Sequence, residues 1–233
     1  MGGGWDSTDW QHNHLNTCPG NAAFNVASCD ISQNANSFIG GGQIGARWQT
    51  GHFVLGIEGT ADYARFNAVD RDPAGAAALA AGLTVFNLVD TTRLRNLYTV
   101  TGQAGYAWNR QLVYVKGGWA GSSLWRDMLE TSTVNGTFFD GQVSQQVNGW
   151  TVGVGFEYRL MSMPNFSVGV EYDYMRLTAG NATACATGTA LNIFACPAPA
   201  QPLLFNGFHA DVNQVLLRGN YTFNWSGPVV AKY

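Results

Sequence analysis

The chain has 233 residues, of which only 12% are charged and 13% are aromatic, and it carries 29 glycines and a net charge of −3. So little charge does not suit the surface of a soluble domain, and the 12 scattered Lys and Arg residues exclude a basic nucleic-acid-binding surface. Mean hydropathy is −0.06, and no run of about 18 apolar residues predicts a membrane helix. This combination is typical of a transmembrane β-barrel, in which apolar and polar residues alternate.

Segments in which apolar and polar residues alternate with a period of two predict β-strands along most of the chain. Residues 2–6 are the predicted remnant of a first strand, whose beginning is expected to be missing together with any leader. The further predicted strands cover 38–49, 53–66, 92–108, 112–125, 146–160, 166–177 and 215–223. Most are about twice as long as the five or six residues usual in globular proteins, and this length suits a tilted membrane crossing.

The connections between these segments alternate in length. Turns near residues 51, 110 and 163 are short, whereas the connections 7–37, 67–91, 126–145 and 178–210 are long and polar. Short periplasmic turns and long extracellular loops are typical of outer-membrane barrels. We therefore predict an all-β fold: an eight-stranded antiparallel transmembrane β-barrel with four long extracellular loops. It forms a single domain over residues 1–225, followed by a C-terminal tail at 226–233.

Four cysteines form two local pairs, Cys18 with Cys29 and Cys185 with Cys196, and both pairs lie in predicted long loops. They have no CxxC spacing and no adjacent histidine cluster that would indicate a zinc site. A disulfide within each pair is therefore expected, which implies an oxidising compartment. Pairing between the two loops is the alternative, because the first and last strands of a closed barrel are neighbours.

The polar faces of the predicted strands carry charged residues of both signs. They are Arg47, Glu58, Asp62, Arg93, Arg95, Lys116, Glu157, Arg159, Glu171, Asp173 and Arg218. Eight strands leave an interior just wide enough for side chains to fill, and an isolated charge buried there is costly. We therefore expect these residues to form a salt-bridged network that closes the lumen. A small polar channel or proton path is the alternative interpretation.

Motifs of glycine and aromatic residues recur along the predicted strands. They are 40–45 (GGGQIG) followed by Trp48, 53–59 (FVLGIEG), 105–108 (GYAW), 113–120 (VYVKGGWA) and 153–158 (GVGFEY). Together they resemble the small outer-membrane barrel proteins of alphaproteobacteria, of the opacity-protein and OmpA-like membrane-domain family. Members of this family commonly end on an aromatic residue, whereas this chain continues past Phe223 to Tyr233.

The resemblance implies a role for the last strand in biogenesis. Its apolar face carries Val215, Leu217, Gly219, Tyr221 and Phe223. This strand is expected to be the C-terminal signal for the barrel-assembly machinery. The other expected partners are outer-membrane lipid and lipopolysaccharide.

The predicted function is that of a structural, surface-exposed protein that supports the integrity of the bacterial outer membrane. The resemblance implies surface antigens of this kind, sometimes called porin-like. No catalytic residues and no cofactor are predicted.

A narrow porin for small solutes is one rival function, and a loop-based binding protein for haem, a host protein or a partner protein is another. His12, His14 and His209, beside Trp10 and Phe208, are the candidates for such binding. His12 and His14 are also candidates for a metal, although a solvated polar loop explains them more simply. A soluble β-sandwich is the third rival.

Overall fold

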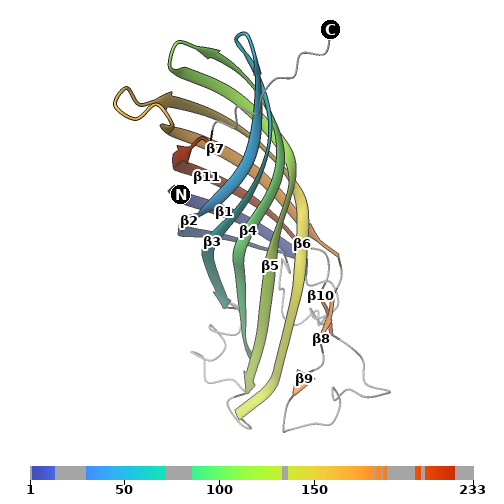
Figure 1. The fold of residues 1–233 in the computed structure, drawn as a ribbon. Helices are drawn as coiled ribbons and strands as arrows, with labels where there is room; N and C mark the ends of the chain where they lie inside the picture. The colour runs from blue at the N-terminus through green and yellow to red at the C-terminus, as the bar shows by residue number, and fades with distance from the viewer. Residues whose placement is uncertain are drawn as a thin grey trace.

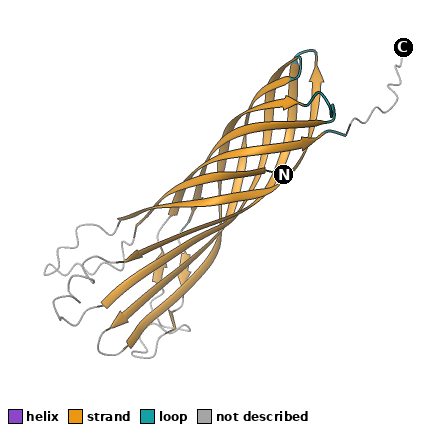
Figure 2. Ribbon diagram, turned by 90° about the vertical axis from the view of Figure 1, so that its left-hand side faces the viewer, coloured by secondary structure: helices purple, strands orange, loops and turns teal. Residues whose placement is uncertain are grey.

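The described part of the chain consists almost entirely of antiparallel β-strands (Figures 1 and 2). A computed structural model describes residues 2–13, 30–71, 86–132, 136–180, 182–184, 186–187, 203–205 and 208–223. The long strands are β1 (Gly2–Asn13), β2 (Asp30–Thr50), β3 (Phe53–Arg71), β4 (Phe86–Trp108), β5 (Gln111–Ser132), β6 (Gly136–Arg159), β7 (Phe166–Ala179) and β11 (Phe208–Tyr221). Short strands are β8 (Ala182–Ala184), β9 (Ala186–Thr187) and β10 (Leu203–Phe205). The predicted all-β antiparallel fold is confirmed.

The sheet curls around an interior because consecutive long strands pair as neighbours (Figure 1). β1 pairs with β2 on one side and with β11 on the other, so the first and last long strands lie side by side. β5 and β6, the outermost long strands of the row, also pair with each other along their length. Every long strand therefore finds a partner for both of its edges over part of its length.

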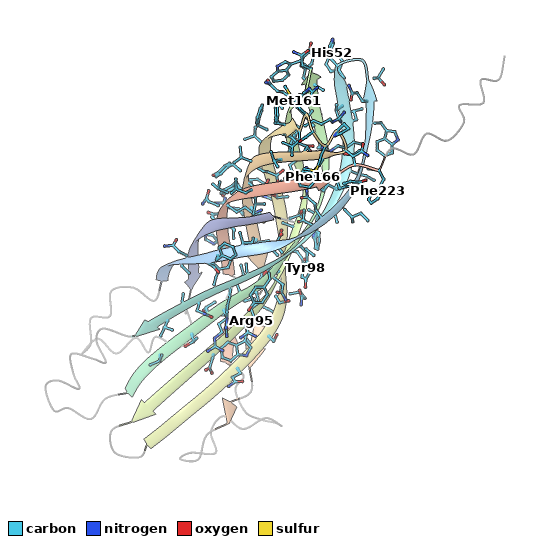
Figure 3. All side chains as sticks on the ribbon, turned by 60° about the vertical axis from the view of Figure 1, so that its left-hand side comes forward. His52, Arg95, Tyr98, Met161, Phe166 and Phe223 are labelled. Carbon is cyan, nitrogen blue, oxygen red and sulfur yellow. The ribbon has the colours of Figure 1, made fainter. Side chains whose placement is uncertain are left out.

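Short turns join the strands at one end of the molecule. Gly51 and Asn109 have positive φ values of 60° and 52°, the left-handed conformation that two-residue hairpin turns require. The ring of His52 stacks on that of Tyr106, and its Nδ1 lies 2.9 Å from the carbonyl oxygen of Ala107. These contacts hold the β2–β3 turn against β4 at this end, where His52 is labelled in Figure 3.

Strands at the opposite end are longer than the sequence predicted. Most of the predicted loop 126–145 belongs to β5 and β6, and β1 continues to Asn13 instead of ending near residue 6. Beyond the pairs Gly40–Tyr63 and Asn148–Thr178, β2 separates from β3 and β7 from β6. β3 to β6 then continue as a projecting sheet (Figure 1). Its residues do not alternate simply between apolar and polar, which explains why the period-two pattern missed them.

The outer face carries a band of exposed apolar side chains. Leu55, Val100, Val115 and Val154 are between 48% and 61% exposed. Exposed aromatic residues lie on both sides of the band: Trp48, Phe53 and Tyr106 toward the turns, and Tyr63, Tyr98, Trp119 and Trp150 toward the opposite end. From Phe53 to Tyr63 the strand rises about 33 Å, which at a tilt of about 40° gives a band about 25 Å tall. This is the height and composition of a lipid-facing surface.

No helix within the described ranges is long and apolar enough to cross a membrane.

Candidate functional site

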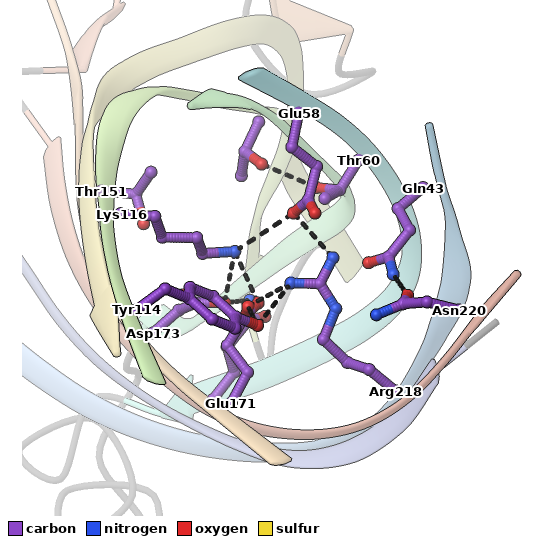
Figure 4. Close-up of polar contacts among 12 residues, drawn as sticks. Gln43, Glu58, Thr60, Tyr114, Lys116, Thr151, Glu171, Asp173, Arg218 and Asn220 are labelled. Carbon is purple, nitrogen blue, oxygen red and sulfur yellow. Dashed lines mark hydrogen bonds and ion pairs between the residues drawn. The ribbon is translucent and has the colours of Figure 1, made fainter. Parts of the chain in front are cut away.

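The candidate site is the charged interior, where the sequence predicted a network of salt bridges. Five residues on four strands form its centre (Figure 4). Glu58 comes from β3, Lys116 from β5, Glu171 and Asp173 from β7, and Arg218 from β11. All five are at most 6% exposed. Each lies on the face of its strand opposite to the apolar band, because neighbouring residues of a strand point to opposite sides of the sheet.

These residues form one continuous network of ion pairs. The Lys116 Nζ lies 2.5 Å from Glu171 Oε1, 3.2 Å from Asp173 Oδ2 and 3.7 Å from Glu58 Oε1. The Arg218 Nη2 lies 2.7 Å from Glu58 Oε1, and its Nη1 contacts the second oxygen of Glu171. Two cations therefore face three carboxylates, and the attraction between them offsets the cost of removing these charges from water.

Neutral side chains complete the network. The Tyr114 hydroxyl donates a hydrogen bond of 2.5 Å to Glu171 Oε2, and the Gln214 amide donates one of 2.9 Å to Asp173 Oδ2. Both residues are buried. The sequence analysis missed them because it selected charged residues only. Tyr114 and Gln214 lie an even number of residues from Lys116 and Arg218 on the same strands, so the period of two also predicts that they face the interior.

A second polar cluster lies nearer the short turns. The Arg47 Nη1 is 2.6 Å from Glu157 Oε2. Ser167 and Asn220 also donate to this carboxylate, at 2.5 and 3.0 Å, and Gln43 donates to the Asn220 amide oxygen. Arg47 also lies over the ring of Tyr114, at 5.6 Å from its centroid. Tyr114 therefore connects the two polar clusters.

Apolar side chains fill the interior on the other side of the network, toward the end opposite the short turns. This layer includes Ile39, Phe66, Leu94, Leu97, Leu124, Val147, Met175, Leu177 and Val212, each 0% exposed. The period-two pattern did not predict this layer. It combines with the ion network to fill the interior from two sides.

Inward-facing glycines make room for the large polar side chains. A Cβ atom on Gly155 would overlap the ring of Tyr114, and one on Gly153 would overlap the carboxylate of Asp173. Interiors as dense as this one do not absorb an added methyl group without a shift of side chains or backbone. These two glycines therefore help to position the network, although the sequence presented them only as parts of glycine–aromatic motifs.

Gly155→Ala is expected to lower the free energy of unfolding by about 1–3 kcal/mol, because the new methyl group displaces the Tyr114 ring. Urea unfolding in lipid vesicles measures this effect. Gly102→Ala is the control, since no atom lies within 4 Å of the place that its new methyl group would occupy and the expected change is below about 0.5 kcal/mol. When Tyr114 is replaced by Leu, Gly155→Ala should lower the free energy of unfolding by less than it does in the wild type. An unchanged loss would contradict the conclusion that Gly155 makes room for the Tyr114 ring.

The remaining predicted lumen residues do not all join the network. Asp62 is buried beside Gly41, whereas Arg159 is exposed where β6 ends near the short turns. Arg93 and Arg95 face outward, so their predicted lumen position was wrong. Asn96, with a φ of 56°, adds one residue to β4 between the pairs Arg95–Ser123 and Leu97–Ser122. Such a bulge reverses which residues face the interior on either side of it.

Several predicted residues lie outside the described part of the chain. These are Cys18, Cys29, Cys185, Cys196 and His14, together with the tail 226–233. His12 belongs to β1 and is paired in register with Ile31 and Phe208. Tyr221 and Phe223 are exposed and pack edge to face, with ring centroids 4.8 Å apart. Among the described residues, no group of three or more His, Cys, Asp or Glu side chains is placed to hold a metal ion.

Comparisons with known proteins find one family model and several solved structures that are similar to this chain. The family model described as an outer membrane protein beta-barrel domain matches residues 1–195. No curated protein sequence matches the chain. Among solved structures, the outer membrane protease OmpT from Escherichia coli is 10% identical, with 95% of this chain and 96% of that chain covered and a TM-score of 0.52. Ail, the attachment invasion locus protein of Yersinia pestis, is 11% identical, with 95% of each chain covered and a TM-score of 0.37.

Proposed function

The chain belongs to the outer membrane protein β-barrel domain family and lies in the bacterial outer membrane, and we propose that it acts there as a structural, surface-exposed barrel with a closed interior. Its eight long strands cross the membrane, with the short turns in the periplasm and the longer connections outside. The protein supports the integrity of the membrane and presents its connections at the cell surface. This role requires neither a cofactor nor a catalytic group.

The observation that carries the proposal is the filling of the interior. Ion pairs among Glu58, Lys116, Glu171 and Arg218 join β3, β5, β7 and β11 across the interior. The apolar layer beside them lacks the polar surface that a water column needs. A narrow porin would instead have a continuous lumen with one sign of charge in excess, so the filled interior favours the structural role.

The narrower relationship to opacity-protein and OmpA-like surface proteins is also part of the proposal. Its support is the set of glycine–aromatic motifs on β2 to β6, together with the outward pair Tyr221 and Phe223 at the end of β11. We propose that this last strand is recognised by the barrel-assembly machinery. Binding of haem, a host protein or a partner protein by the loops is the rival function, with His12 and His14 as its candidates.

Deletion of the gene followed by complementation tests the function. The deletion strain should become more sensitive to bile salts and to large antibiotics that an intact outer membrane excludes. The wild-type chain should restore resistance, and so should the variant His12→Ala/His14→Ala, which removes two candidates of the loop-binding rival. Unchanged sensitivity in the deletion strain would contradict a role in membrane integrity. Loss of complementation by the His12→Ala/His14→Ala variant alone would favour the loop-binding rival.

The cysteines provide a separate prediction about the surface. We expect Cys18 to pair with Cys29 and Cys185 with Cys196, each closing a ring of roughly a dozen residues and stabilising it by less than about 3 kcal/mol. Reduction should make these segments sensitive to protease while strand content, measured by circular dichroism, stays constant. Peptide mapping without reductant identifies the pairs, and a linked fragment that joins the first segment to the last would contradict local pairing.

A further inference from the structure

Three arginines form a basic cluster on the outer face of the projecting sheet. Arg65 on β3 lies directly opposite Arg95 on β4, and Arg93 lies two residues along β4 on the same face. Arg65 and Arg95 are exposed, and the Arg93 guanidinium lies 4.5 Å from the ring centroid of Trp125 on β5. We call Arg65, Arg93 and Arg95 the rim arginine cluster. The bulge at Asn96 creates it, because without that extra residue Arg93 and Arg95 would point into the interior.

Like charges directly opposite each other on neighbouring strands are destabilising unless an anion lies between them. Neither Arg65 nor Arg95 forms an ion pair with a carboxylate of the described residues. Arg176, the outward arginine of β7, differs in this respect: two of its nitrogens each lie 2.7 Å from a different oxygen of Asp211. The rim arginine cluster therefore combines concentrated positive charge with guanidinium donors that can bind an external anion.

The position of the cluster indicates where that anion comes from. Arg65 follows Tyr63 by two residues and Arg95 precedes Tyr98 by three, so both arginines lie just past the aromatic edge of the apolar band. Figure 3 labels Arg95 and Tyr98 at this edge. Aromatic residues mark the level at which lipid headgroups begin. A guanidinium group donates two parallel hydrogen bonds to a phosphate, and this geometry makes arginine the preferred residue for binding it.

We propose that the rim arginine cluster binds the phosphate groups of lipopolysaccharide at the surface of the outer leaflet. Arg65 and Arg95 would share one phosphate across the β3–β4 pair, and Arg93, fixed by its stack on Trp125, would contact the next. Bound lipid removes the repulsion between the arginines and attaches the projecting sheet to the membrane surface. The proposal rests on the proposed function in one respect, namely that this end of the barrel faces the outside.

Titration of the purified full-length protein in detergent micelles with bisphosphorylated lipid A tests the proposal, with bound lipid counted by native mass spectrometry. The double variant Arg65→Gln/Arg95→Gln should bind about 30-fold more weakly than the wild type. Arg176→Gln is the matched control and should bind as the wild type does. Arg65→Lys/Arg95→Lys keeps the charge but not the paired donors, and it should show intermediate affinity. Heat modifiability on gels verifies that each variant is folded.

Three outcomes would overturn the proposal. They are equal binding by the double variant, an equal loss in Arg176→Gln, and equal binding of dephosphorylated lipid A or phosphatidylglycerol in place of bisphosphorylated lipid A. Orientation is tested separately with an epitope tag inserted at residues 133–135 and labelled on intact cells. Labelling only after permeabilisation would contradict the proposed function, whereas the micelle titration does not depend on orientation.

Discussion

Lys116→Met should lower the free energy of unfolding by about 3–5 kcal/mol, because it leaves buried carboxylates without their cation. Lys116 contacts Glu58, Glu171 and Asp173, and all four side chains are at most 5% exposed. Arg218 alone cannot neutralise three carboxylates in this environment. Urea unfolding of the protein in lipid vesicles, followed by tryptophan fluorescence, measures the loss.

Arg159→Met is the matched control, since Arg159 is exposed and its replacement should change stability by less than about 0.5 kcal/mol. The double variant Lys116→Met/Glu171→Gln should recover part of the loss, because it removes one of the unpaired charges together with the cation. Equal stability of Lys116→Met and Arg159→Met would show that the ion network does not hold the strands together.

Val154→Arg should lower the free energy of unfolding by about 2–4 kcal/mol. Val154 lies in the apolar band on β6, so the new charge would enter the hydrocarbon core of the membrane. Val154 is 48% exposed and lies between Val115 and Tyr172 of the neighbouring strands. The same unfolding measurement in vesicles gives the cost. Val170→Arg on β7, where the valine is 44% exposed, should behave alike.

Ser144→Arg provides the comparison on the same strand. Ser144 is exposed on the same face of β6 as Val154 but lies past Trp150, beyond the aromatic edge of the band. Arginine there should cost no more than about 1 kcal/mol, since the side chain reaches water or headgroups. Similar costs at Ser144 and Val154 would contradict the assignment of the band to lipid.

The sequence was most informative where a strand has one face toward lipid and one toward the interior. On β5, Val113, Val115 and Trp119 alternate with Lys116, and the structure places them on opposite faces as the period of two requires. The projecting halves of β3 to β6 have no such contrast. Phe66 and Leu124 face the interior near the ends of the predicted strands 53–66 and 112–125, and the residues that follow them were interpreted as loop.

The bulge at Asn96 shows a different limit. Alternate residues of a strand share a face, and counting back from Thr99 and Thr101 in steps of two placed Arg93 and Arg95 in the lumen. The extra residue Asn96 shifts this alternation, so that both arginines face outward. A single asparagine in a long strand does not by itself predict a bulge, although asparagine tolerates the positive φ that Asn96 adopts there. Likewise, charge and position on the polar face of a predicted strand selected Lys116 and Glu171, but the roles of Tyr114 and Gly155 depend on contacts between strands far apart in sequence.

Closure of the interior by the ion network and the apolar layer together is the property on which the proposed function depends. Ion conductance of the purified wild-type protein in a planar lipid bilayer tests it most directly. We expect a silent membrane, with no stepwise current, at protein amounts that give regular insertions of a control porin. Uniform, long-lived conductance steps from the wild-type protein would show a continuous water-filled lumen and would contradict the closed interior.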